Sequence, residues 1–187
     1  LTMKTAEQAI TVTANSKSQI YNGEALVDDG SKLTAGNLLA GDRLVVTVVG
    51  SATNVTDTKT GNNKITEVKV MHGEEDVTAN YKITKVDGTL TINPATVTIT
   101  AKSEEFTYDG NAHSNVKYDV TGLVGNDAIE AVVEGSITYP SQSPVENKVT
   151  SHEFTTGDAR NYTVSYVAGT LTMKTAEQAI TVTANSK

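Results

Sequence analysis

The sequence predicts an all-β protein, built from two tandem immunoglobulin-like β-sandwich units, with β-grasp-like repeats as the alternative architecture. Threonine and valine occur throughout the 187 residues, whereas tryptophan is absent and phenylalanine occurs only twice, so the apolar positions are mostly β-branched and favour strands. Short alternating stretches separated by turn residues are typical of sandwich strands. An apolar content of 37% favours thin, two-layer domains over a deeply buried parallel sheet.

Repetition in the sequence sets the expected division into units. Residues 1–17 recur without change as residues 171–187. Within this long period, the stretch at 10–14 returns in related form at 97–101 and again at 180–184, so a repeat of roughly 85 residues fills the chain. We therefore expect the final strand of a preceding repeat at 1–4, unit 1 at 5–93, unit 2 at 94–173, and the first strand of a following repeat at 174–187.

The first strand of each unit has the clearest pattern. Residues 10, 12 and 14 are apolar and alternate with threonines, and residues 97, 99 and 101 do the same. This is the period of two that a half-buried strand shows. The stretches at 44–49 and 129–133 are more continuously apolar, so we expect them in the middle of a sheet.

The end of each unit has the pattern of a β-hairpin. The predicted strand at 81–86 leads through Asp87-Gly88 into residues 89–92, and the strand at 162–167 leads through Ala168-Gly169 into residues 170–173. Two strands joined by a glycine turn predict a hairpin. The connection between the units, residues 93–96, is short and not rich in glycine, which predicts limited bending between them.

A Tyr-Asx-Gly motif follows the first strand in both units, and two interpretations of it are open. It could form an exposed tip whose tyrosine stacks on a sugar. Alternatively it is structural: the Asx side chain bonds the nearby backbone, glycine supplies a positive φ, and tyrosine anchors the turn. The structural interpretation is the expected one. The motif residues are Tyr21, Asn22 and Gly23 in unit 1 and Tyr108, Asp109 and Gly110 in unit 2.

A second pair of matched residues precedes the predicted hairpins. These are Asn80 with Tyr81 in unit 1, and Asn161 with Tyr162 in unit 2. A tyrosine at such a corner of a sandwich can bury its ring and use its hydroxyl as a hydrogen-bonding anchor. We expect a core role for both pairs rather than a binding role.

Composition and spacing argue against several classes of function. The net charge of −7 is opposite to what a nucleic-acid-binding surface needs, and no stretch approaches the roughly 20 apolar residues of a membrane helix. The chain has no cysteine, and His72, His113 and His152 have no partner at metal-ligand spacing. Acidic clusters at 28–31 and 74–76 lack the periodicity of a calcium loop and are expected to be solvated turns. We expect no cofactor, no metal, no catalytic residue and no enzyme activity.

An internal crosslink is a further hypothesis for a chain without disulfides. A lysine and an asparagine can form an isopeptide bond when a buried carboxylate promotes the reaction. Lys64 and Lys148 recur at matched positions beside asparagines, although a solvated lysine on a strand face explains them equally well.

The order of these motifs resembles a known family. A Thr-Val-Thr-Ile-Thr-Ala strand, then Tyr-Asp-Gly, then Asn-Tyr and a closing Gly-Thr-Leu-Thr-Ile is similar to the MBG and YDG-type repeats of bacterial cell-surface proteins and adhesins. The resemblance implies an extracellular stalk or spacer, attached to the cell wall by an anchor outside these residues, that projects an adhesive region. The alternative it leaves open is a module that binds mucin or another host glycan through many weak sites.

The duplicated ends predict one more interaction. Residues 175–187 repeat the first strand of unit 1, so Ile180, Val182 and Ala184 carry an apolar face with no partner in their own unit. We expect this segment to add to the edge of a sheet, either in the preceding unit or in a neighbouring chain. Because the two segments are identical, strand exchange between chains needs no new contacts.

Overall fold

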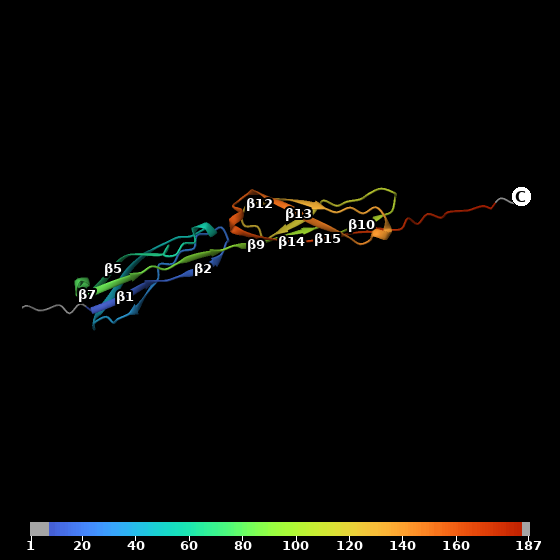
Figure 1. Ribbon diagram of the computed structural model, residues 1–187. Helices are drawn as coiled ribbons and strands as arrows, with labels where there is room; N and C mark the ends of the chain where they lie inside the picture. Colours follow the sequence, from blue (N-terminus) through green and yellow to red (C-terminus); the bar gives the residue numbers. More distant parts are fainter. Residues whose placement is uncertain (1–7, 185–187) are drawn as a thin grey trace, which may run out of the picture. The chain divides into compact units, whose positions relative to one another are not determined.

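The computed structural model describes residues 8–184, and the contacts of the chain divide it into two compact units (Figure 1). The boundary along the chain lies between Ala95 and Thr96, and residues 160–162 are counted with the first unit. The strand expected at 1–4, the start of unit 1 at 5–7 and the last three residues of the expected strand at 174–187 lie outside the described residues.

The first unit contains eight strands and two short 3₁₀ turns among the described residues. They are β1 (Gln8–Ala14), β2 (Lys17–Ile20), β3 (Ser31–Ala35), β4 (Asp42–Val49), η1 (Val55–Asp57), β5 (Lys64–His72), β6 (Glu75–Asp76), η2 (Thr78–Asn80), β7 (Tyr81–Val86) and β8 (Leu90–Asn93). They form sheets in the orders β3-β1-β7, β4-β5-β6 and β2-β8. Strand β1 runs antiparallel to β3 and parallel to β7, and β2 runs parallel to β8.

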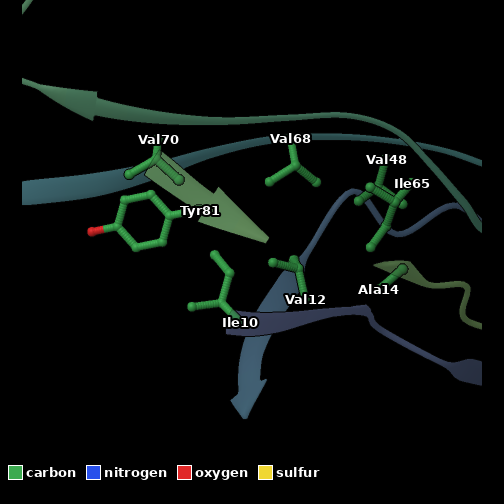
Figure 2. Close-up of a cluster of buried hydrophobic side chains, with 8 residues drawn as sticks. All are labelled: Ile10, Val12, Ala14, Val48, Ile65, Val68, Val70 and Tyr81. Atoms are coloured by element: carbon green, nitrogen blue, oxygen red, sulfur yellow. The ribbon is translucent and has the colours of Figure 1, made fainter. Parts of the chain in front are cut away.

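Two sheets of the first unit meet at a core of aliphatic side chains (Figure 2). Strand β1 contributes Ile10, Val12 and Ala14, which are at most 2% exposed. The other sheet contributes Val48 from β4 and Ile65, Val68 and Val70 from β5, and β7, the neighbour of β1, adds Tyr81. A second cluster, formed by Leu26, Ala52, Leu90 and Ile92, lies at the β2-β8 end of the unit. Alternation along β1 therefore places its apolar residues in the core and its threonines outside.

The second unit repeats this arrangement in its own strands. They are β9 (Ala95–Ala101), β10 (Glu104–Thr107), β11 (Tyr118–Thr121), β12 (Ala128–Glu134), η3 (Pro140–Gln142), β13 (Val145–Thr156), η4 (Ala159–Asn161), β14 (Tyr162–Val167) and β15 (Gly169–Lys174). The sheet orders are β11-β9-β14 and β10-β15-β13-β12. Residues 175–184 follow β15 without joining any sheet (Figure 1).

The all-β prediction is confirmed, and the layered sheets agree with the predicted β-sandwich. The β-grasp alternative expects a helix packed against the sheet. Over residues 8–184, the only helical elements are four 3₁₀ turns of three residues each. The sandwich interpretation therefore fits the strands and the β-grasp alternative does not.

The hairpin prediction is wrong in both units. Strand β7 pairs with β1, whereas β8 pairs with β2, so the two strands that flank Asp87-Gly88 lie in different sheets. In the second unit, β14 lies beside β9, while β15 lies between β10 and β13. The glycine turn therefore carries the chain from one sheet to the other. Strands β1 and β2 lie in these same two sheets, where β1 pairs in parallel with β7 and β2 pairs in parallel with β8.

The expectation that 44–49 and 129–133 lie in the middle of a sheet is also wrong. Strands β4 and β12 are the outer strands of their sheets. Their continuous apolar character reflects valines on both faces: Val49 is 59% exposed and Val132 is 50% exposed. Valine favours the strand backbone on an exposed face as well as on a buried one, so the run predicted a strand but not its position.

Candidate functional site

The Tyr-Asn-Gly loop of the first unit is a tight turn anchored to the end of the unit. The Asn22 side-chain oxygen accepts a hydrogen bond from the Glu24 amide at 2.9 Å, and Gly23 has a φ of 80°. The Tyr21 amide donates to the carbonyl of Asn93 at the end of β8, at 2.8 Å. The Tyr21 ring packs against the cluster of Leu26, Ala52, Leu90 and Ile92. All three motif residues thus hold the turn in place.

The Tyr-Asp-Gly loop of the second unit has the same geometry and an added charge. Asp109 Oδ1 accepts hydrogen bonds from the Asn111 amide and from His113 Nε2, both at 2.9 Å, and Gly110 has a φ of 89°. These bonds, the Asn111 amide first, lower the pKa of Asp109 to about 2. The Tyr108 ring packs against Ile137, Leu171 and Met173. The carboxylate therefore makes its hydrogen bonds within its own loop, to Asn111 and His113.

A shallow hollow lies beside the second loop. It has a volume of about 470 Å³ and is lined by Tyr108, Asp109, Gly110, Ala176 and Gln178. The Tyr139 ring lies 6.2 Å from that of Tyr108 and is 53% exposed. Tyr139 is the cap of η3, whereas the matching cap of η1 in the first unit is Asn54. An exposed aromatic ring beside a polar turn can stack on a sugar, but only the second unit has it at this place.

Tyr81 is a buried anchor with a charged partner. Its side chain belongs to the core, with the hydroxyl directed away from the aliphatic cluster (Figure 2). The hydroxyl donates to Asp42 Oδ2 at 2.5 Å and accepts from the Leu39 amide at 2.9 Å. His72 Nδ1 lies 2.7 Å from the other oxygen of Asp42. The Tyr81 hydroxyl, followed by His72, lowers the pKa of Asp42, while burial, followed by the bond to Asp42, raises the pKa of Tyr81.

The corresponding residues of the second repeat, at the end of η4 and the start of β14, are buried too. Tyr162 is 7% exposed, the same as Tyr81, and Asn161 is 1% exposed. Asn80 differs, since it is only half-buried at the end of η2, where its amide donates to the Val77 carbonyl. Tyr81 and Tyr162 therefore begin matching strands and are equally buried, whereas the asparagines before them differ in burial.

Asn63 and Asn147 form matched polar centres that sequence reasoning missed. Both are 0% exposed. Asn63 Nδ2 donates to the carbonyls of Asn15 and Asp28 at 2.9 Å each, and Asn147 Nδ2 donates to those of Lys102 and Asn115 at 2.9 and 2.8 Å. Their backbones pair with the glycines at the sheet crossing, Gly88 and Gly169. The sequence signal that could have revealed them is that each asparagine recurs at the matched position of its unit, before Lys64 and Lys148.

The carbonyl side of each buried amide lies against a glycine. Asn63 Oδ1 and Asn147 Oδ1 are buried and accept no hydrogen bond within the described part of the chain. A Cβ on Gly50 or on Gly135 would lie 2.5 Å from these oxygens. Each asparagine therefore needs a residue without a Cβ opposite its side-chain oxygen. The asparagine and the glycine are thus packed as a pair in each repeat.

The lysines beside these asparagines do not approach a crosslinking geometry. Lys64 and Lys148 are exposed, and Lys148 Nζ pairs with Glu146 at 3.0 Å. The amide nitrogens of Asn63 and Asn147 are held by backbone carbonyls. The geometry supports the solvated-lysine interpretation over the isopeptide hypothesis at these positions.

The three histidines lie apart from one another in hydrogen-bonded pairs. His72 pairs with Asp42, His113 with Asp109, and His152 Nδ1 with the hydroxyl of Tyr166 at 2.5 Å. Within residues 8–184, no group of three or more His, Asp or Glu side chains could hold a metal ion. In the acidic clusters, Asp28 and Asp76 accept hydrogen bonds from the amides of Gly30 and Thr78 and close local turns. A helix long and apolar enough to cross a membrane is not found in that same range.

Two of the residues expected to add to a sheet, Ile180 and Val182, are the most exposed large apolar residues of the described chain. Ile180 is 86% exposed, Val182 is 88% exposed, and Ala184 is exposed as well. The structure does not add them to a sheet of the second unit. Strand addition to another chain stays a prediction.

Comparison with known proteins found a family that most of the second unit is similar to. Residues 97–172 match the family described as the MBG domain of YGX type, which is a non-catalytic repeat of surface proteins. The match begins within β9 and ends within β15. Comparison of the chain with curated proteins and with solved structures gave no match.

Proposed function

We propose that this chain is a structural stalk or spacer of a bacterial cell-surface adhesin, because residues 97–172 match the MBG domain family. It acts outside the cell, attached to the cell wall, and holds a binding region away from it. No reaction is assigned to it, since its matched side chains are engaged in turns, sheet crossings and cores.

One observation carries the proposal: a single residue connects the last strand of one repeat to the first strand of the next. Strand β8 ends at Asn93 and β9 begins at Ala95, so only Pro94 lies between them. Proline fixes its own φ and restricts the residue before it. From this short connection we expect little bending between successive repeats, which is what a spacer needs.

The spacer proposal predicts how size grows with repeat number. We would measure the largest dimension by small-angle X-ray scattering for chains that carry two, four and six units. A stiff spacer grows in proportion to the number of units, whereas units on flexible joints grow roughly as its square root. The matched control inserts a Gly-Ser linker after Pro94. Growth that is no steeper without the linker than with it would contradict the proposal.

A second function, multivalent binding of mucin or another host glycan, is favoured by one feature. Tyr139 is 53% exposed beside the hollow at Tyr108 and Asp109. Binding of the intact chain to immobilised mucin would test it, with Tyr139→Ala as the variant and Val116→Ala, at another exposed apolar residue, as the control. Saturable binding that only Tyr139→Ala abolishes would favour the glycan function over a purely structural one.

A further inference from the structure

The Tyr-Asn-Gly loop of the first unit contains a chemically reactive pair of residues. Asn22 and Gly23 are both exposed, and Asn22 is the only asparagine of the sequence that is followed by glycine. The backbone nitrogen that follows an asparagine can attack the side-chain amide carbon and close a five-membered ring. Glycine favours this attack because it has no Cβ to obstruct the approach and little restriction on its φ. The Asn22 Cγ and the Gly23 nitrogen are therefore the candidate reacting atoms.

The loop holds the Asn22 amide toward the backbone that would attack it. Asn22 Oδ1 accepts hydrogen bonds from the Glu24 amide at 2.9 Å and from Gln19 Nε2 at 3.3 Å. The first of these bonds folds the side chain back over the peptide bond between residues 22 and 23. Both donors also draw electron density toward Oδ1, where negative charge develops when a nucleophile adds to the carbonyl carbon. Orientation and polarisation thus both favour attack at this residue.

The second unit shows that an aspartate fits the same turn. Asp109 stands where the first unit has Asn22. Its Oδ1 accepts a hydrogen bond from the amide two residues later at 2.9 Å, as the Asn22 oxygen does. The glycines that follow the two residues have φ values of 89° and 80°. An aspartate at position 22 can therefore keep both the hydrogen bond and the backbone conformation of this turn.

Other asparagines of the chain lack at least one of these conditions. Asn63 and Asn147 are 0% exposed. Asn37 is exposed, but Leu38 follows it, and a bulky side chain on the following residue hinders the attack. Asn15 precedes a serine, but its Nδ2, the atom that would leave, donates a hydrogen bond to a carboxylate at 3.1 Å. Exposure, a following glycine and a polarised carbonyl come together at Asn22.

We propose that Asn22 is a site of spontaneous deamidation in the folded protein. The Gly23 nitrogen loses its proton to solvent and bonds to Cγ, and the bond from Cγ to Nδ2 then breaks. Ammonia leaves with a proton taken from water, and a cyclic imide remains. Water opens the imide at one of its two carbonyls, which leaves either aspartate or isoaspartate at position 22. The overall reaction consumes one water, releases one ammonia, involves no redox change and adds one negative charge to the net charge of −7.

The two products change the loop in different ways. Aspartate gives the first unit the charged turn that the second unit already has at Asp109. Isoaspartate places Cβ and Cγ in the main chain, so the Glu24 amide loses its side-chain acceptor. The modified loop is therefore either a copy of the turn in the second unit or a loosened one.

The test follows the intact, folded chain during incubation at pH 8. Peptide mapping by mass spectrometry, with electron-transfer fragmentation to distinguish aspartate from isoaspartate, measures conversion at each asparagine. We expect Asn22 to convert about tenfold faster, or more, than the exposed control Asn37, because glycine leaves the attacking nitrogen unobstructed and the turn orients it. Anion exchange should resolve a more acidic species, part of which elutes with the Asn22→Asp variant.

Two variants assign the result to this turn. Asn22→Gln keeps an uncharged amide but lengthens the side chain, so ring closure is slow and the acidic species should disappear. Asp109→Asn places an Asn-Gly pair in the matching turn of the second unit, and that position should return to the wild-type mass during incubation.

Three outcomes would count against the proposal. Conversion of Asn22 at the rate of Asn37 would show that the loop is not reactive in the folded chain. Persistence of the acidic species in Asn22→Gln would trace the added charge to another residue. An Asp109→Asn chain that keeps its amide as long as Asn37 does would remove the role given to the turn.

Discussion

At the scale of single residues, the two buried asparagines hold together the points where the chain changes sheets. Asn63 Nδ2 binds the carbonyl of Asn15, between β1 and β2, and that of Asp28, before β3. The Asn63 backbone exchanges hydrogen bonds with Gly88, between β7 and β8. One side chain and its backbone therefore satisfy buried groups from three crossings that the sheets leave unpaired.

Removing the Asn63 amide should destabilise the first unit. Asn63→Ala leaves the carbonyls of Asn15 and Asp28 without their donor, and buried unsatisfied groups cost about 1–3 kcal/mol each. We expect a loss of about 2–4 kcal/mol in the free energy of unfolding, measured by urea denaturation. Asn147→Ala should act in the same way on the second unit.

The control for this prediction is an asparagine with no buried role. Asn37 is exposed after β3, so Asn37→Ala should change stability by no more than about 0.5 kcal/mol. Equal effects of Asn63→Ala and Asn37→Ala would show that the buried amide is not a structural centre.

Asp109 gives the second unit a stability increment that depends on pH. Its pKa is about 2 in the folded state, against an ordinary value of 3.8. A carboxyl group with a lowered folded pKa stabilises the protein above its unfolded pKa, and the increment is lost as pH falls through the folded pKa. Asp109→Asn should therefore lower the Tm at pH 6, and this deficit should shrink as pH falls from 4 to 2.

Asn22→Asp provides the converse variant, because it places the carboxylate in the equivalent turn of the first unit. The Glu24 amide that donates to Asn22 would then donate to a charge. The Tm of this variant, compared with wild type by circular dichroism over the same pH range, should fall more steeply below pH 4. A pH-independent Tm difference for Asp109→Asn would contradict the role given to the charge.

The residue types explain why the sequence revealed the Tyr-Asx-Gly turns and not the buried asparagines. Tyr-Asx-Gly is a local motif, so the hydrogen bond from residue 24 to Asn22 follows from turn chemistry alone. The bonds of Asn63 reach residues 48 and 35 positions away in the chain. Asparagine is usually found in exposed turns, and nothing local marks one that is buried by distant carbonyls.

At the scale of elements, the crossing from β7 to β8 depends on a glycine that lets two backbones meet. A Cβ on Gly88 would lie 2.0 Å from the carbonyl oxygen of Asn15. That carbonyl also receives the Asn63 amide, so it cannot move without breaking the bond. In the second unit, a Cβ on Gly169 would lie 2.5 Å from the Lys102 carbonyl, at the matching crossing.

Gly88→Ala should therefore cost about 3 kcal/mol in the first unit, as an overpacked substitution against backbone. The control is Gly73→Ala, at a turn with a φ of 62° and no heavy atom within 4 Å of the added Cβ. Gly73→Ala should lower the free energy of unfolding by about 1 kcal/mol, because alanine is disfavoured in the left-handed conformation and meets no other obstacle. Chemical denaturation of both variants would measure the two losses of stability. A larger loss for Gly73→Ala than for Gly88→Ala would show that the crossing is not tightly packed.

The strands themselves were predictable from alternation, but their partners were not. Residues 10–14 and 97–101 show the period of two, and both lie within strands. A glycine between two strand patterns is also the signal of a hairpin, and it led to a pairing of β7 with β8 that the sheets do not contain. Parallel pairing of β1 with β7 and of β2 with β8 joins residues from opposite ends of the unit, so no local pattern encodes it.

At the scale of the whole molecule, each repeat supplies its own apolar clusters. The clusters around Val12 and around Leu90 contain residues of the first unit, and the cluster around Leu171 contains residues of the second. Repetition placed the expected boundary at 93/94, and the contacts of the chain place it between Ala95 and Thr96. A spacer gains from such a division, because damage to one unit leaves the others folded.

This division makes a prediction that reciprocal core variants can test. Ile99 is 0% exposed in β9, and Ile99→Ala should destabilise the second unit by about 3 kcal/mol through loss of buried methyl groups and the cavity left behind. Ile10, 2% exposed in β1, serves as the matched position in the first unit. Native-state hydrogen exchange with mass spectrometry would follow β13 and β5 as reporters.

With Ile99→Ala, exchange should accelerate in β13 while β5 keeps its protection, and with Ile10→Ala the pattern should reverse. The reason is that opening of a local cooperative unit exposes only the amides that the unit contains. If either variant accelerated β5 and β13 equally, the chain would unfold as one body. Length could then not be added one independent repeat at a time, which is the property that the proposed spacer function requires.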